Sequence, residues 1–180
     1  PRFLQAITAA SFAYVVMAFL MTATPISMHI IHNLSLEKTG LVIQFHVLSM
    51  FLPSLFTGNL IKKFGYSKMM YLGVFFYILT ILISLFEPTF FNYLFGLIFL
   101  GIGWNFLFVS GTSLLVTTYK PEEKFKAQGF NDLVVFSATA LSSLSAGILI
   151  SLTSWKTLNL LCIPFLILIV VSIINADRSN

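Results

Sequence analysis

The chain is a succession of long apolar segments separated by short polar breaks. A helix needs about 20 apolar residues to cross the roughly 30 Å of hydrocarbon in a bilayer. Six segments fit this length: Phe3–Met28, Thr39–Ile61, Met69–Phe86, Phe90–Thr118, Ala127–Ser151 and Thr157–Ile174. None alternates apolar and polar residues as barrel strands do. The sequence therefore predicts an all-α membrane protein, with a single six-helix bundle over residues 1–180.

The composition argues against a soluble domain. Hydrophobic residues make up 58% of the 180 residues and charged residues 9%, whereas soluble domains carry about 25% charged residues. The lipid bilayer is therefore the expected partner. The net charge of +4 comes from residues in short breaks rather than from a solvated basic surface, so no nucleic acid is expected. The single cysteine, Cys162, excludes an internal disulfide, and the proline at position 1 suggests a longer natural protein.

The positive charges divide unequally between the two sets of breaks that six spans would create. One set carries Arg2, Lys62, Lys63, Lys68, Lys120, Lys124, Lys126 and Arg178. The other carries only Lys38 and Lys156. Because cytoplasmic loops are enriched in lysine and arginine, this bias predicts that both termini are cytoplasmic. We expect an integral multi-pass protein of a bacterial cytoplasmic membrane.

The polarity pattern repeats after three segments. The first and fourth segments are rich in small and polar residues, whereas the third and sixth are almost entirely apolar. The fifth has a small residue at every fourth position from Thr139 to Ser151, which predicts a helix-packing seam. A triplet contains an odd number of spans, so the second triplet enters from the opposite side. Two inverted three-helix repeats are typical of secondary transporters.

A family resemblance is carried mainly by the break after the second segment. It reads Gly58-Asn59-Leu60-Ile61-Lys62-Lys63-Phe64-Gly65-Tyr66-Ser67-Lys68. This resembles the G-x-L-x-D-R-x-G-R-K loop of the major facilitator superfamily, with Lys62 in place of the aspartate of the family's N-terminal half. Such a departure is usual in the C-terminal half. The stretch from Tyr119 to Asp132 is similar to the one that leads into the family's eleventh helix.

The resemblance implies a twelve-helix fold, with this chain as its C-terminal six-helix half and the N-terminal half of the same transporter as its partner. It also implies a central cavity between the halves and alternating access. Polar residues inside spans are the candidates for lining that cavity. The candidate cavity residues are Thr22, His46, Trp104, Asn105, Phe108 and Thr112. For His46 a proton site and a hydrogen bond to a neighbouring helix both remain open, and for Asn105 a substrate contact and an interhelical hydrogen bond.

A candidate cytoplasmic gate combines the loop motif with the start of the fifth segment. Its residues are Gly58, Lys62, Lys63, Gly65, Asn131 and Asp132. Asp132 lies about three turns into its helix, where a carboxylate needs a cation or several donors. We expect Lys62, Lys63 or a basic residue of the other half to pair with it as a latch. A proton-carrying role and a solvated surface charge are the alternatives.

The sequence contains no pattern of an enzyme, such as H-E-x-x-H or a glycine-rich phosphate loop. Neither a cofactor nor a metal is expected. Met17, Met21, Met28, His29 and His32 suit soft metals, but packing is the simpler interpretation. The predicted function is the C-terminal half of a secondary active transporter that moves a small solute, driven by an ion gradient. The alternatives are a self-contained six-helix scaffold or channel subunit and a membrane-embedded enzyme.

Overall fold

The computed structural model describes residues 1–179, and within them it contains helices and connecting loops without a strand. The α-helices are α1 (Arg2–Pro25), α2 (Leu36–Phe51), α3 (Ser54–Phe64), α4 (Tyr66–Ser84), α5 (Phe90–Val116), α6 (Lys124–Leu152), α7 (Trp155–Leu160) and α8 (Ile163–Arg178). A π-helical turn, η1 (Ile26–Ile31), extends α1, and a 3-10 turn, η2 (Pro121–Glu123), precedes α6. The predicted all-α fold is confirmed.

Five helical stretches of the described chain are long and apolar enough to cross a membrane. They are Arg2–Ile31, Tyr66–Ser84, Phe90–Val116, Pro121–Leu152 and Trp155–Arg178. A sixth candidate is the pair α2 and α3, which bends by 41° at its break. Pro53 lies in that break, where its missing N–H interrupts the helical hydrogen bonds. Each stretch overlaps one of the segments predicted from the sequence.

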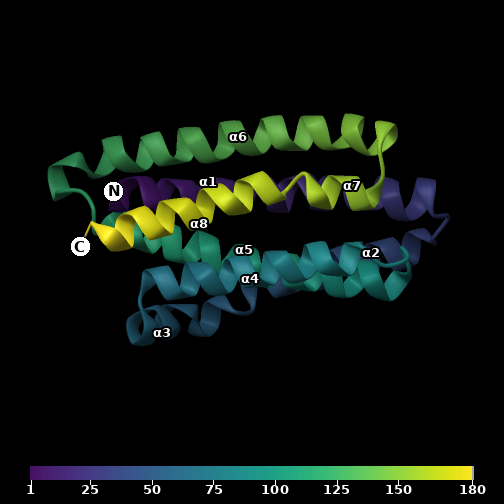
Figure 1. Cartoon of the computed structure of the whole chain (residues 1–180), viewed down its shortest axis with the longest axis horizontal. Helices are drawn as coiled ribbons and strands as arrows, with labels where there is room; N and C mark the ends of the chain where they lie inside the picture. Colours follow the sequence, from purple (N-terminus) through teal and green to yellow (C-terminus); the bar gives the residue numbers. More distant parts are fainter. Residues whose placement is uncertain (180) are drawn as a thin grey trace.

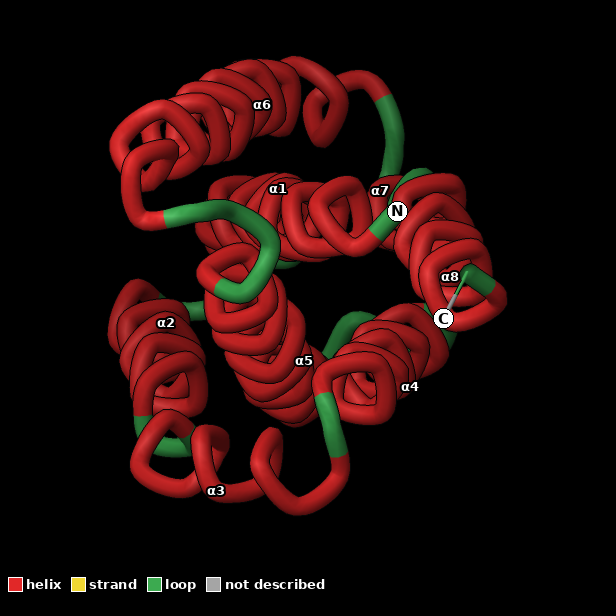
Figure 2. Tube along the Cα trace, turned by 90° about the vertical axis from the view of Figure 1, so that its left-hand side faces the viewer, coloured by secondary structure: helices red, strands yellow, loops and turns green. Residues whose placement is uncertain are grey.

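The helices run side by side, and both termini lie at the same end of the bundle (Figure 1). The end-on view in Figure 2 shows α1 and α5 at the centre, with α2 and α6 toward one side and α4 and α8 toward the other. Helix α1 packs against α6 and α8, and α5 packs against α2 and α4. The first triplet of spans is α1, the pair α2 and α3, and α4, and the second is α5, α6, and the pair α7 and α8. The first helix of each triplet thus packs against the second and third spans of the other triplet, as expected for two three-helix repeats.

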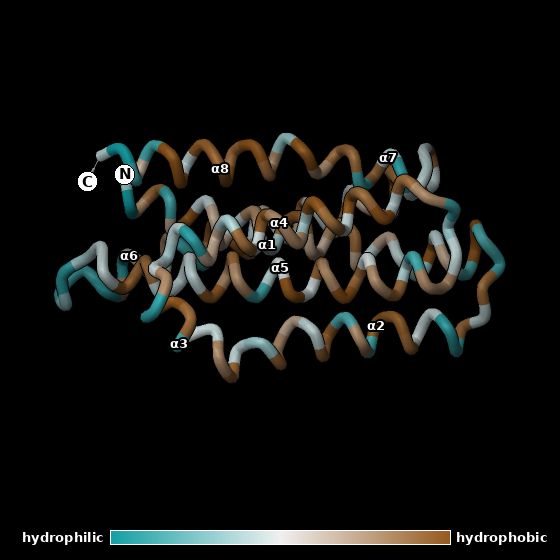
Figure 3. Tube along the Cα trace, turned by 60° about the horizontal axis from the view of Figure 1, so that its bottom comes forward, coloured by the Kyte–Doolittle hydropathy of each residue, from teal (hydrophilic) through white to brown (hydrophobic). Residues whose placement is uncertain are grey.

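Hydropathy changes along the bundle axis. Figure 3 shows hydrophilic residues gathered toward the two ends and mostly hydrophobic residues along the helices between them. Large apolar side chains are also exposed on the outer faces of the helices, among them Leu82, Ile167 and Val171. In water such a surface would be unfavourable, whereas in a bilayer it contacts lipid.

Helix α5 approaches its neighbours closely through glycines. A Cβ atom built on Gly103 would lie 2.9 Å from the carbonyl oxygen of Gly73 on α4. One on Gly111 would lie 2.9 Å from the Ala6 oxygen on α1, and one on Gly101 would lie 2.7 Å from the His46 oxygen on α2. These distances are too short for a side chain, so the glycines permit backbone-to-backbone packing with three different helices.

The small residues predicted to form a packing seam on α6 lie beside the face that α6 buries within this chain, and the seam stays a prediction. Helix α6 buries the face that contains Ala127, Asn131, Val135, Ser142, Ala146 and Ile150. On this face the Ser142 hydroxyl donates to the Val15 carbonyl of α1 at 2.7 Å. A Cβ on Gly147, in the predicted seam, would have no described atom within 4 Å.

Candidate functional site

Aromatic rings from four helices meet on the side of the bundle bounded by α2 and α6 (Figure 2). This aromatic cluster consists of Tyr14 on α1, Phe51 on α2, Trp104 and Phe108 on α5, and Phe136 on α6. Trp104 and Phe108 are one turn apart on α5 and stack with their centroids 5.0 Å apart and 14° between their planes. Tyr14 contacts both rings edge-on, at 5.1 and 4.9 Å. The rings therefore form one continuous surface.

The cluster runs from the core to the surface of the described chain. Trp104 is 3% exposed, Tyr14 and Phe108 are half-buried, and Phe51 and Phe136 are 58% and 59% exposed. The indole N–H of Trp104 is buried and has no hydrogen-bond partner among the described residues. Rigid aromatic faces that are exposed or half-buried can bind a flat molecule by stacking.

Asn105, a candidate cavity residue, is fully buried and holds the break between α2 and α3. Its amide Nδ2 donates to the Met50 carbonyl at 2.7 Å and to the Ser54 hydroxyl at 2.6 Å. Its Oδ1 accepts from the Thr57 hydroxyl at 2.7 Å. All polar atoms of this side chain are engaged, so the structure favours the interhelical hydrogen bond over a substrate contact.

The other candidate cavity residues lie in different environments. Trp104 and Phe108 belong to the aromatic cluster. His46 is fully buried, with Nδ1 2.8 Å from the Leu97 carbonyl oxygen of α5, and this favours the helix-bonded alternative. The Thr112 hydroxyl donates to the Phe108 carbonyl of its own helix at 2.8 Å, which leaves it less available to a ligand. Thr22 is half-buried on α1, about two turns from Tyr14.

The residues of the candidate gate are not brought together within this chain. Helices α3 and α6 lie on opposite sides of α1 and α5 in the end-on view (Figure 2), because the bend at Pro53 directs α3 toward α4 and α5. Among residues 1–179, Asp132 makes no ion pair with Lys62 or Lys63, and its pairing with a basic group stays a prediction.

The individual gate residues have separate environments. Gly58 and both lysines are exposed, and Gly65 has a φ of 87°, a conformation that favours glycine at this turn. Asp132 is exposed and accepts from the amide of the buried Asn131 at 3.1 Å. Its carboxylate therefore remains available to a group outside this chain.

The loop motif also takes part in a contact that the sequence did not predict. The Ser67 hydroxyl donates to Asp177 at 2.7 Å and accepts from the Gln5 amide at 3.1 Å. These residues join the beginnings of α1 and α4 to the end of α8. The motif thus fastens the helix ends on the side of the termini, and no local pattern links positions so distant in the chain.

Three members of the aromatic cluster were also missed by sequence reasoning. Tyr14, Phe51 and Phe136 lie on three different spans and share no motif. A usable signal exists only for Tyr14, which is three positions from Ser11 and four from Ala18 on the polar stripe of the first span. Phe51 and Phe136 are indistinguishable in sequence from lipid-facing phenylalanines.

The sequence pattern of the Major Facilitator Superfamily matches residues 6–179. The chain is 41% identical over 174 residues to the riboflavin transporter RfnT of Brucella anthropi, which covers 97% of this chain and 44% of that protein. It is 34% and 31% identical to the uncharacterized MFS-type transporters YdeG and YddS of Bacillus subtilis, covering 82% of this chain and 34% of each relative. The chain thus spans less than half the length of these relatives. It is an integral membrane protein of a transporter family rather than an enzyme, and it belongs to the Major Facilitator Superfamily.

Proposed function

We propose that this chain is the C-terminal six-helix half of a secondary transporter, and that the transporter moves riboflavin or a similar planar heteroaromatic solute across a bacterial cytoplasmic membrane. The relative with 41% identity is named a riboflavin transporter. The proposal that this is the second half rests on the loop motif, where Lys62 replaces the family's aspartate.

The observation that carries the solute class is the aromatic cluster. A flavin ring system is flat, and stacking on an aromatic side chain contributes about 1–3 kcal/mol for a nucleobase of comparable chemistry. Tyr14 and Phe108 are half-buried and line the side bounded by α2 and α6, where they would offer such a surface.

The surface around the cluster suits a second six-helix half. Helix α6 is packed mainly against α1, and its outer residues, including Leu141 and Leu144, are exposed. The stripe of small residues on α6 would allow close approach of helices from the other half. Rocking of the two halves around the aromatic cluster would give alternating access, coupled to an ion gradient.

The test is uptake of labelled riboflavin by the full-length protein in proteoliposomes, with and without a proton gradient. Tyr14→Ala and Phe108→Ala should each reduce uptake about tenfold or more, since each removes a stacking surface. Phe75→Ala is the matched control, because Phe75 is 50% exposed on α4, away from the cluster. Thermal stability in detergent is measured in parallel to separate loss of function from loss of fold.

Absence of riboflavin uptake by the wild-type protein would reject the solute assignment. Equal uptake by the Tyr14→Ala and Phe75→Ala variants would reject the role of the cluster. Counterflow distinguishes the carrier from the channel alternative, because only a carrier exchanges labelled external solute for unlabelled internal solute against a concentration difference.

A further inference from the structure

We propose that the end of the bundle opposite the termini carries a binding site for a phospholipid with a primary amine in its headgroup, such as phosphatidylethanolamine. The headgroup would occupy a pocket at the start of α7, and an acyl chain would occupy an apolar groove between α4 and α8. This site is separate from the aromatic cluster and does not depend on the identity of the transported solute.

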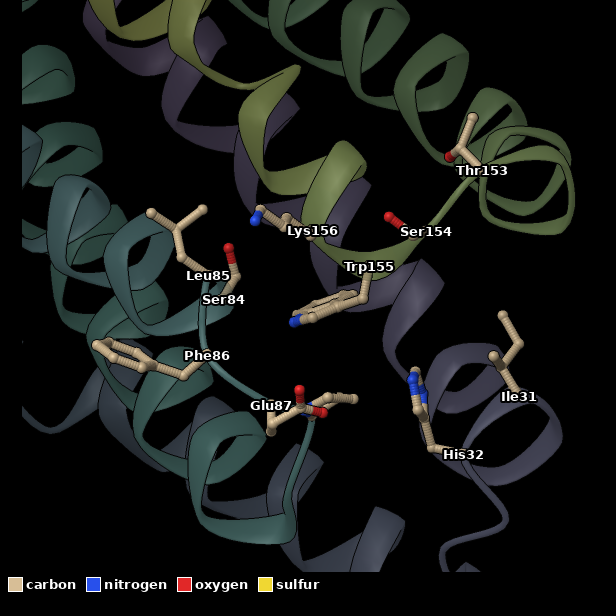
Figure 4. Close-up of a pocket in the computed structure, with 11 residues that line it drawn as sticks. Ile31, His32, Ser84, Leu85, Phe86, Glu87, Thr153, Ser154, Trp155 and Lys156 are labelled. Carbon is tan, nitrogen blue, oxygen red and sulfur yellow. The ribbon is translucent and has the colours of Figure 1, made fainter.

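The headgroup pocket has a volume of about 340 Å³. Its walls come from three breaks: the end of η1, the loop after α4 and the loop before α7. Figure 4 shows the indole of Trp155 in the middle of the pocket, with Lys156 on one side and Glu87 on the other. The ring centroids of Trp155 and Tyr93 lie 5.0 Å apart, and this packing holds the indole in place.

The acyl groove begins where the pocket ends. It has a volume of about 460 Å³ and is lined by Val74, Ile78, Ile81, Leu82, Leu85, Leu160, Ile163, Leu166, Ile167, Val170 and Val171. Leu85 lines both the groove and the pocket. On the facing helix, Lys156 of the pocket and Leu160 of the groove are one turn apart on α7. The charged pocket and the apolar groove thus lie next to each other along α4 and α7.

The position of this pair of cavities favours a lipid over a soluble ligand. Helices α4 and α8 lie away from α2 and α6, on the side that the proposed second half leaves exposed to lipid (Figure 2). Trp155 marks the depth of the membrane interface, where indole rings are enriched. An amphiphile with one polar end and a long apolar chain fits the junction, whereas a polar metabolite would leave the groove unfilled.

The charges of Lys156 and Glu87 would determine which lipid headgroup binds in the pocket. The Lys156 ammonium suits a lipid phosphate, and the Glu87 carboxylate suits a protonated primary amine that donates hydrogen bonds. Phosphatidylcholine carries a quaternary amine without such donors, and phosphatidylglycerol places no cation near Glu87. The pocket therefore predicts a preference for the zwitterionic lipid with a primary amine.

Native mass spectrometry of the full-length protein in mild detergent tests this preference. Equal amounts of phosphatidylethanolamine, phosphatidylcholine and phosphatidylglycerol are added, and retained lipids are counted. We expect about tenfold stronger retention of phosphatidylethanolamine. The variant Glu87→Gln/Lys156→Gln should lose this preference. The control Glu37→Gln/Lys38→Gln should keep it, because it removes the same charges from exposed positions outside the pocket at the same end of the bundle.

The groove is tested separately with Leu82→Trp, which fills part of it. This variant should lower retention of all three lipids without removing the headgroup preference. Equal retention of the three lipids by the wild-type protein would overturn the proposal, as would an unchanged preference in the Glu87→Gln/Lys156→Gln variant. Failure of riboflavin transport would not bear on either result, because the measurement reports lipid binding alone.

Discussion

The side-chain amide of Asn105 donates to the backbone carbonyl of Met50 across a distance of 2.7 Å, at the end of α2 just before Pro53. Proline cannot donate a backbone hydrogen bond, so helix breaks within a membrane need donors from neighbouring helices. Asn105 supplies two donors and one acceptor to this break from α5.

Replacing Asn105 should therefore destabilise the fold rather than alter solute recognition. We expect Asn105→Ala to lower the free energy of unfolding by about 1–3 kcal/mol, the cost of leaving buried polar groups unpaired. Thermal unfolding in detergent measures this loss. Thr112→Val is the control, because its hydroxyl bonds only to its own helix and its loss should change stability little. A stable Asn105→Ala protein with a raised KM for solute would instead support the original cavity assignment.

Replacing glycine by alanine should affect protein stability much more on α5 than on α6. Gly103→Ala should destabilise the protein by about 1–3 kcal/mol, since the new Cβ would overlap the Gly73 carbonyl and the Tyr77 ring. Gly147 has open space around it within this chain, so Gly147→Ala should leave the stability of the six-helix unit unchanged. Thermal stability and yield of the two variants provide the measurement. Similar losses in both would show that Gly147 packs against the other half.

Asp132 remains a candidate latch toward the other half of the transporter. Its carboxylate is exposed here, and a basic residue outside this chain would have to pair with it. We expect Asp132→Asn to shift the full-length protein toward the inward-facing state while solute binding is largely retained. Labelling of a cysteine placed at Thr22, outside the aromatic cluster, from each side of the membrane reports the shift. Glu122→Gln, another exposed acid at the same end, should not produce it.

The orientation in the membrane is open to direct chemical labelling. Cys162 is buried, and a Cys162→Ser background removes its residual reactivity. Single cysteines at the exposed positions Glu37 and Lys68 should react from opposite sides, with Lys68 on the cytoplasmic side. Reaction of both with an impermeant reagent added outside would contradict the predicted topology.

Sequence reasoning identified the spans because hydrophobic length alone determines them. The apolar segments and the common end of the termini both follow from local composition and the number of crossings. The role of Asn105 was left open, because the partner that decides it, the Met50 carbonyl, is 55 residues away.

The site was harder to predict than the fold for a related reason. The aromatic cluster joins Tyr14 to Phe136 across 122 positions, and nothing in the sequence distinguishes Phe136 from the many other phenylalanines. The position of α3 relative to α6 could not be predicted either, because it depends on the direction of the 41° bend between α2 and α3. A proline predicts that a helix breaks, but packing decides where the second piece points.

The contact between Gly73 and Gly103 has a consequence for how this chain can diverge over evolutionary time. A Cβ at either position would meet a side chain, Leu107 or Tyr77, and also the other glycine's carbonyl oxygen at 2.9 Å, so full room for it requires the helix backbone to move. A substitution at one cannot be compensated by trimming a neighbour. Exchange among the large rings of the aromatic cluster, in contrast, alters only side chains. Under the proposed function, substitutions among these rings would change the choice of solute and leave the spacing between α4 and α5 unchanged.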